Sequence, residues 1–288
     1  MKRFARHPWR RLPWLWVLPL LLLALPGRSS RADAPSTDCR RPVVRLETGL
    51  GTLELELDAA TAPQAVTLVT RLLHEPIEAS GEAAGTLRYY EGLGFDYTRP
   101  HVLIAVGERP ALPALSTPTR IDAVALGLDH RRLADAAEAM EVLQRELLPA
   151  YIHRRNDATP RLAAWVERWR QDFEADFLVG VSRQAVNEAL GHAYERGLPS
   201  LPPVRGAVAL WPESPTVSTP RLAILLADLP ERAGRWMVVG RVTRGFEVAE
   251  AISARPLVAE PANRSFRPVD PVRIDAAGVE CRPEADVP

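Results

Sequence analysis

The sequence predicts a mainly β protein with an α-helical segment inserted between two β-rich parts. In both outer parts, apolar and polar residues alternate with a period of two, which is typical of strands with one buried face. Between them, apolar residues recur at helical spacing, and proline-rich stretches flank the change in pattern. A length of 288 residues is more consistent with one hydrophobic core and one inserted segment than with two independently folded domains. We therefore expect residues 33–121 and 204–288 to form one β domain and residues 122–203 to form a helical insertion.

Residues 1–32 have the composition of an export signal. Several basic residues precede an apolar run at positions 12–25, which contains Pro13 and Pro19. A membrane-spanning helix needs about 20 apolar residues, so this run favours a signal peptide, with an uncleaved membrane anchor as the alternative. We expect an exported protein, either periplasmic or anchored at the outer face of the inner membrane, that meets the membrane only through this segment.

The charge of the remaining chain argues against nucleic-acid binding. Residues 1–32 hold seven of the 36 basic residues and no acidic one, so 29 basic residues remain against 36 acidic ones. Neither of the two cysteines has a second ligand at zinc-like spacing. We expect no nucleic-acid partner, no metal and no cofactor.

The first β-rich part begins with a hairpin and continues into a helix. Residues 43–47 and 53–57 alternate in polarity on either side of a Thr-Gly-Leu-Gly turn. From Thr61 onwards the apolar residues adopt helical spacing, and Pro63 is tolerated because it falls in the first turn. The sequence YYEGLGF at positions 89–95 follows a Gly- and Glu-rich connection.

Three helices are expected in the insertion. The first spans residues 130–148, the second begins after the Thr159-Pro160 cap, and the third runs from Ser182 to Gly197. The second helix carries Trp165, Trp169 and Phe173 along one side. This aromatic stripe is explained either by packing within a small helical bundle or against the β domain, or by a surface for a partner protein.

The second β-rich part holds the most specific motif of the chain. Residues 222–227 form an apolar run that ends at Asp228-Leu-Pro, residues 236–242 form a second run, and Gly245 precedes an amphipathic helix. The sequence can be written as LAD-x-P, a loop, GR, an aromatic residue and V-x-G-R-V. Together with YYEGLGF and A-P-x-x-V near Pro63, this motif resembles the cyclophilin-type peptidyl-prolyl cis-trans isomerases. The resemblance covers residues 42–107 and 204–280.

The resemblance implies a fold and an activity. The fold would be a closed antiparallel β-barrel capped by two helices, here with the helical insertion. The activity would be rotation about X–Pro bonds, which faces a barrier of about 18–20 kcal/mol. A protein can lower that barrier by donating a hydrogen bond to the prolyl nitrogen while an apolar pocket holds the ring. The family makes that donation from an arginine.

The positions that match the family's site hold other residues in this chain. Tyr97 stands where the family has its arginine, in G-F-D-Y instead of x-F-H-R. The positions that bind the peptide in the family carry different side chains here: Val102, Ala105, Leu222, Ala223, Glu231 and Trp236. The residues typical of the family's fold are therefore kept, while the residues at the positions of the family's active site have changed.

Two arginines could replace the missing donor. Arg99 lies two residues after Tyr97, so in a strand it would face the same side about 7 Å away. Arg221 stands where the family has a glutamine and could also reach the cleft. The alternative is that both are ordinary surface arginines.

Cys39 and Cys281 lie near opposite ends of the exported chain. In an oxidising compartment an even pair is interpreted first as a disulfide, with two free thiols as the alternative. The resemblance implies that the first and last strands are antiparallel neighbours, which would place these two residues side by side.

Two functions remain open from the sequence. The first is a cell-envelope prolyl isomerase of weak activity that assists the folding of exported proteins. The second is a catalytically inactive binding module or scaffold, which uses the cleft or the insertion for protein binding. In both cases the expected ligands are proline-containing segments of exported proteins, and the insertion could bind a further partner protein.

Overall fold

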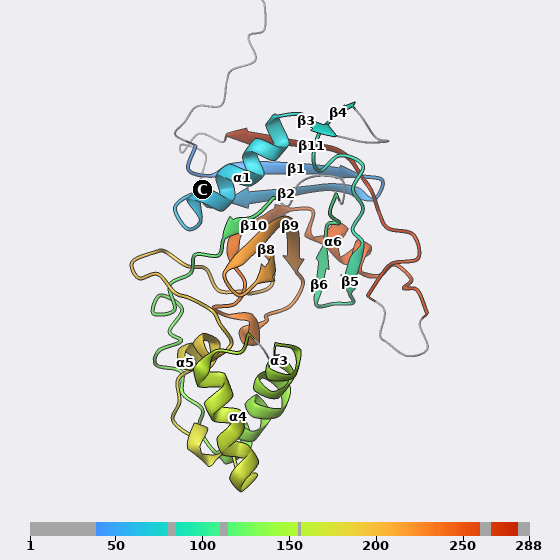
Figure 1. Cartoon of the computed structure of the whole chain (residues 1–288). Coiled ribbons are helices and arrows are strands. Elements are labelled where there is room, and N and C mark those ends of the chain that lie inside the picture. The colour runs from blue at the N-terminus through green and yellow to red at the C-terminus, as the bar shows by residue number, and fades with distance from the viewer. Residues whose placement is uncertain (1–38, 80–84, 110–114, 155–156, 260–265, 282–288) are drawn as a thin grey trace, which may run out of the picture. The chain divides into compact units, whose positions relative to one another are not determined.

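A single curled antiparallel sheet of nine strands forms the framework of the described chain (Figure 1). The computed structural model describes residues 39–79, 85–109, 115–154, 157–259 and 266–281, and the expected export segment 1–32 lies outside them. The sheet order is β11-β1-β2-β10-β8-β9-β6-β5, with β7 paired to β9. Its strands are β1 Pro42–Thr48, β2 Gly51–Leu57, β5 Tyr97–Arg99, β6 Leu103–Ala105, β7 Thr117–Pro118, β8 Ala207–Ser214, β9 Val217–Leu225, β10 Val238–Arg244 and β11 Ile274–Cys281. A separate hairpin consists of β3 Ile77–Ala79 and β4 Gly85–Leu87.

Backbone hydrogen bonds join the two ends of the curled sheet. Phe95 N–H donates to Val272 O at 2.9 Å, and Ile274 N–H donates to Leu93 O at 2.8 Å. These bonds link the segment before β5 to the segment around the start of β11, and one isolated bridge pairs Gly94 with Arg273. The expected antiparallel barrel is therefore present, closed by these bonds instead of a regular ladder.

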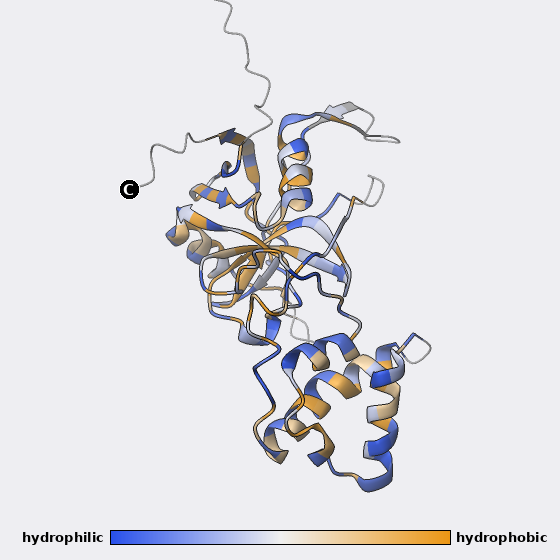
Figure 2. Ribbon diagram, turned by 90° about the vertical axis from the view of Figure 1, so that its left-hand side faces the viewer, coloured by the Kyte–Doolittle hydropathy of each residue, from blue (hydrophilic) through white to orange (hydrophobic). Residues whose placement is uncertain are grey.

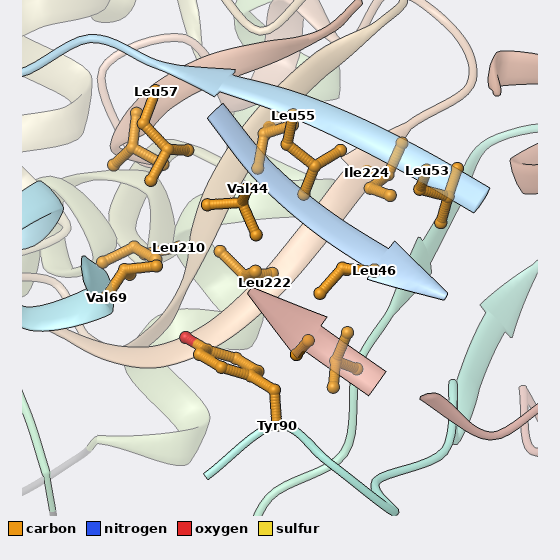
Figure 3. Close-up of a cluster of buried hydrophobic side chains, with 14 of the residues drawn as sticks. Val44, Leu46, Leu53, Leu55, Leu57, Val69, Tyr90, Leu210, Leu222 and Ile224 are labelled. Carbon is orange, nitrogen blue, oxygen red and sulfur yellow. The ribbon is translucent and has the colours of Figure 1, made fainter. Parts of the chain in front are cut away.

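The interior of the sheet is filled by the apolar residues of the alternating strands. Val44 and Leu46 on β1 and the leucines of β2 are fully buried, and they converge on Leu222 of β9 and on Tyr90 (Figure 3). The Tyr90 hydroxyl donates to Pro220 O at 2.7 Å, so this buried polar group has a partner. Burying the alternate face of β1 and β2 fixes their register, because a slip by one residue would expose every leucine.

Two helices contribute side chains to the same core. Helix α1 spans Pro63–His74 and buries Ala65, Val66, Val69, Leu72 and Leu73. Helix α6 spans Phe246–Ser253 and buries Val248, Ala249 and Ile252. It starts after Gly245, whose φ is 78° and where a Cβ would lie 2.1 Å from Thr52 O. The close approach of α6 to β2 thus requires glycine at this position.

The helical segment has an apolar core of its own. Its helices are α2 Ala136–Val142, α3 Leu148–His153, α4 Pro160–Asp172 and α5 Arg183–Ala189, with a π-helical stretch Leu143–Leu147 between α2 and α3 and a 3₁₀ turn at Asp176–Leu178. Figure 2 shows both apolar and polar residues along these helices. Trp165 and Trp169 pack against the buried cluster that includes Leu143, Leu162 and Val186. The two tryptophans of the aromatic stripe thus pack within a small helical bundle. The domain bounds, with this segment at 122–203, stay a prediction.

The helix ends differ from those expected in three places. Helix α2 begins only after Asp135, whose carboxylate accepts from Glu138 N–H at 2.9 Å, and the helical region then continues beyond Leu148 to His153. Phe173 is not on the buried stripe, because it ends α4 with a φ of 55° and is 69% exposed. The third helix stops at Ala189, because Gly191 already adopts a φ of 92°; Gly197 lies well beyond its end.

The expected disulfide joins Cys39 to Cys281, with a Cα separation of 5.8 Å. Its geometry follows from the strand order, because β1 and β11 are antiparallel neighbours and Pro42 is paired with Cys281. Over the described ranges, no helix combines the length and apolar character needed to cross a bilayer.

Polar contacts connect the helical segment to the barrel. Asn187 donates to Ala233 O at 3.1 Å, and the Tyr194 hydroxyl donates to Gly234 O at 3.0 Å. His192 lies 3.0 Å from Pro215 O in the β8–β9 turn, so its neutral Nδ1–H can donate there. Burial, with the charges of Arg235 and Arg154 in addition, lowers the pKa of His192 from 6.5 to about 4.

This histidine predicts a loss of stability in mild acid. Between the unfolded and folded pKa values the unfolded chain binds a proton more readily, so stability falls as the pH falls through that window. The free energy of unfolding should drop by about 2 kcal/mol between about pH 7 and pH 5. A His192→Gln variant keeps a donor for Pro215 O and should lose less over the same range, as measured by urea unfolding. Equal losses in the two proteins would show that His192 is not responsible.

Candidate functional site

A row of directly paired residues crosses the outer face of four neighbouring strands, and three of its four members are alanines. Tyr97 on β5 is paired with Ala105 on β6, Ala105 with Ala223 on β9, and Ala223 with Ala209 on β8. Directly paired residues project from the same face of a sheet. The three alanines therefore form a flat floor, and large side chains from its edges pack over it.

Four aromatic side chains form a continuous cluster at this floor. The Tyr97 ring lies 5.0 Å from Trp211 and 5.4 Å from Phe266, and Trp211 lies 5.3 Å from Trp236, all between centroids. Trp236 is 6% exposed, whereas Tyr97, Trp211 and Phe266 are half-buried. We call these four residues the aromatic cluster. It offers a partly accessible apolar surface of the kind on which proline rings pack.

Arg221 lies against the aromatic cluster. Its guanidinium carbon is 4.5 Å from the centre of Trp211 and 5.8 Å from that of Tyr97. Its Nε donates to Val106 O at 2.7 Å and its Nη2 donates to Asp96 Oδ1 at 2.6 Å. Among the described residues, no acceptor binds Nη1. The side chain is 15% exposed, so its position is fixed on two sides while one donor remains available.

Arg99 lies at the exposed end of β5, where the chain turns into β6. The turn passes through His101, which has a φ of 58° and whose N–H donates to Ser253 Oγ at 3.0 Å on α6. Val102 is half-buried and packs at the margin of the floor. Of the two candidate donors, the structure brings Arg221 to Tyr97 and leaves Arg99 in solvent.

The remaining sequence-predicted residues divide between the two faces of the sheet. Ala105 and Ala223 lie in the floor but have no exposed surface, so a ligand could reach them only past the aromatic cluster. Leu222 points to the opposite face and packs in the barrel core. Glu231 is exposed on the turn Pro230–Arg232, 3.9 Å from the Arg232 side chain.

With this geometry in place, comparison with known proteins assigns the family. Residues 43–279 match the family model described as "Cyclophilin type peptidyl-prolyl cis-trans isomerase/CLD". The chain belongs to the cyclophilin family. The match includes the helical segment within its span, and it confirms the resemblance drawn from the sequence motifs.

Solved structures of cyclophilins also resemble this chain. One is a cyclophilin type peptidyl-prolyl cis-trans isomerase from Cryptosporidium parvum, with 15% identity, a TM-score of 0.42 and coverage of 84% of this chain and 99% of that one. A second structure of that isomerase, determined in the presence of the dipeptide Ala-Pro, has 15% identity, a TM-score of 0.42 and coverage of 83% and 99%. No curated protein matches the chain.

Three residues of this candidate site are not among those predicted from the sequence. Trp211 could have been found, because it continues the alternation of Ala207 and Ala209 on β8 and so faces the same side. In the sequence Asp96 is only one residue of the G-F-D-Y motif, and nothing there predicts that its carboxylate pairs with Arg221. No local sequence pattern points to Phe266. Its backbone O accepts a hydrogen bond from Thr98 N–H at 2.6 Å, and this bond places Phe266 next to Tyr97.

Proposed function

We propose that this chain is an exported cyclophilin that binds proline-containing segments of exported proteins and catalyses X–Pro isomerisation weakly in the cell envelope. The observation that carries the proposal is the Arg221 guanidinium, which lies on the aromatic cluster with Nη1 unoccupied among the described residues. The cell-envelope location is supported by the composition of residues 1–32 and by the disulfide, since cytosolic proteins rarely keep one.

The proposed mechanism uses Arg221 in place of the family's arginine. A proline ring packs on Trp211, and the Arg221 Nη1 donates a hydrogen bond to the prolyl nitrogen as the C–N bond twists. This interaction is stronger in the twisted state than in either planar state, which is the condition for catalysis. Weak activity is expected because the donor is displaced: Tyr97 occupies the family's arginine position, and Arg221 would donate from β9 instead. Donors placed away from the best geometry stabilise a transition state poorly.

The second candidate function is binding without catalysis. Tyr97 stands at the donor position, and Trp236 covers the alanine floor where the family has a pocket. An aromatic surface can bind the proline ring equally well in the cis, trans and twisted forms, and such uniform binding does not accelerate rotation. Ile152 and Phe173, which are 71% and 69% exposed on the helical segment, support a further protein contact there.

The experiment that tests the proposed function measures cis/trans exchange of an X–Pro peptide. Wild-type protein should accelerate it, and Arg221→Gln should reduce the catalysed rate by about tenfold or more, because one transition-state donor is lost. Arg161→Gln, which removes an exposed arginine on the helical segment, serves as the matched control.

The same assay separates the alternatives. If Arg99→Ala loses activity while Arg221→Gln keeps the wild-type rate, Arg99 and not Arg221 donates the hydrogen bond to the prolyl nitrogen. No acceleration by the wild type at high protein concentration, with the peptide bound, would favour the binding module.

A further inference from the structure

A second concave site adjoins the aromatic cluster, at the junction of the helical segment and the barrel. It is a cavity of about 620 Å³, and its lining includes Glu146, Arg154 and Arg183 from the helical segment and Arg232, Arg235 and Trp236 from the barrel. Trp236 belongs to both places, since it contacts Trp211 in the cluster and also lines the cavity. An extended chain bound at Trp211 could therefore continue past Trp236 into this cavity.

The base of the cavity holds more positive than negative charge. Arg183 Nη2 donates to both carboxylate oxygens of Glu146, at 2.9 and 3.2 Å, and Arg235 Nη2 donates to Oε2 of the same carboxylate. Arg183, Arg235 and Glu146 are only 8%, 13% and 18% exposed. One carboxylate thus serves two nearly buried guanidiniums, and a buried charge without a partner is costly.

Neighbouring groups do not neutralise this excess of positive charge. Arg235 Nε donates to the neutral Asn187 Oδ1 at 2.7 Å. Arg154 adds a third guanidinium, held by a hydrogen bond from its Nη1 to Leu190 O at 2.9 Å. His192 stays neutral near pH 7, because its pKa is lowered to about 4 by burial and by the charges of Arg235 and Arg154.

Acidic residues also line the cavity, but they are bound elsewhere or lie towards its rim. Glu138 accepts from Ala134 N–H at 2.8 Å at the start of α2, and Glu141 pairs with Arg145 at 2.8 Å. Glu231 is paired with Arg232 at 3.9 Å, and Glu213 is exposed on β8. The excess of positive charge is therefore at the base and not at the rim.

We propose that this arginine-lined cavity binds an acidic side chain of the same peptide that packs its proline on the aromatic cluster. The proposal rests on the proposed function for peptide binding, but not on catalysis. Guanidinium groups present forked donors that match a carboxylate, and the cavity supplies them from two directions. Because the ring centres of Trp211 and Trp236 are 5.3 Å apart and an extended chain advances about 3.3 Å per residue, the acidic residue must lie at least about two positions from the proline.

The inference also gives a role to the helical segment. Glu146, Arg154 and Arg183 come from it, and Glu146 lies in the π-helical stretch Leu143–Leu147. π-Helical turns occur often at functional sites. The segment thus supplies one wall of an extended peptide site whose other wall is the barrel.

The test measures the affinity of a series of peptides, each with one central proline and one Glu. The Glu is placed in turn at each position from about four residues before the proline to about four after it. Each peptide is compared with a control in which Gln replaces the Glu. Binding to the full chain is followed by calorimetry at about 0.15 M salt, where long-range attraction is screened. At one or two positions Glu should bind about tenfold more tightly than Gln. Replacing the proline by alanine should weaken every peptide.

Variants then locate the preference. Arg235→Gln should abolish it, and Arg154→Gln should reduce it. Because Arg154 is exposed, its replacement tests the proposal even if Arg235→Gln fails to fold. Arg161→Gln, outside the cavity, should leave the preference intact. A preference that persists in both cavity variants overturns the proposal.

The pattern of failure separates this proposal from the proposed function. Proline-dependent binding with no Glu preference at any position overturns only the acidic subsite. Absence of proline-dependent binding overturns both.

Discussion

Replacing both Cys39 and Cys281 by serine should lower the free energy of unfolding by about 5 kcal/mol. The bond closes a loop with a sequence separation of 242 residues, and a cross-link across a loop of that length strongly restricts the unfolded chain. The folded state should change little, because β1 and β11 remain paired along their length from Pro42 to Thr48. Urea unfolding of the double variant and of the wild type gives the difference.

Reduced wild-type protein provides the matched control for this prediction. It keeps both sulfur atoms and lacks only the bond, so its stability should equal that of the double variant within about 1 kcal/mol. A double variant as stable as the oxidised wild type would contradict the prediction. It would mean that the unfolded chain already keeps the two ends together.

Replacing Glu146 by glutamine should cost about 3–5 kcal/mol, the range for breaking a buried ion pair by removing one partner. Burial acts to raise the pKa of Glu146, but the charges of Arg235 and Arg183 outweigh it and lower the pKa, so the group is a carboxylate at neutral pH. Without it, two nearly buried guanidiniums face each other unpaired. The free energy of unfolding, followed by tryptophan fluorescence, measures the loss.

Glu141→Gln is the matched control, because Glu141 precedes Glu146 by five residues and pairs with Arg145 at the surface. That pair is exposed, and its loss should change the stability by less than about 0.5 kcal/mol. Equal effects of the two substitutions would show that the Glu146 carboxylate is not required by the two arginines.

Patterns within single elements predicted most of the barrel. The alternation in residues 43–57 specified β1 and β2 together with their buried face, because a strand with one side in the core must alternate. Pro63 and Gly245 marked the beginnings of α1 and α6 for backbone reasons that are local. The even pair of cysteines and the export signal already favoured a disulfide, and the family resemblance supplied the adjacency of the first and last strands that brings the two cysteines together.

The site was less predictable because its contacts join segments far apart in the sequence. Arg221 is held by Asp96, 125 residues away, and Arg235 meets Glu146 across 89 residues. No periodicity within a strand or helix encodes such pairs. Sequence reasoning could therefore identify Arg221 as a candidate donor, but could not tell that it lies on Trp211 while Arg99 points into solvent.

The junction of Cys39 with Cys281 also determines how the molecule responds to mechanical force. The whole barrel lies inside the loop that this bond closes. If the two ends of the chain are pulled apart, the tension passes from one cysteine to the other through the sulfur atoms. The hydrogen bonds between β1 and β11 then carry none of the load. Reduction of the bond would transfer the whole force to that pair of strands.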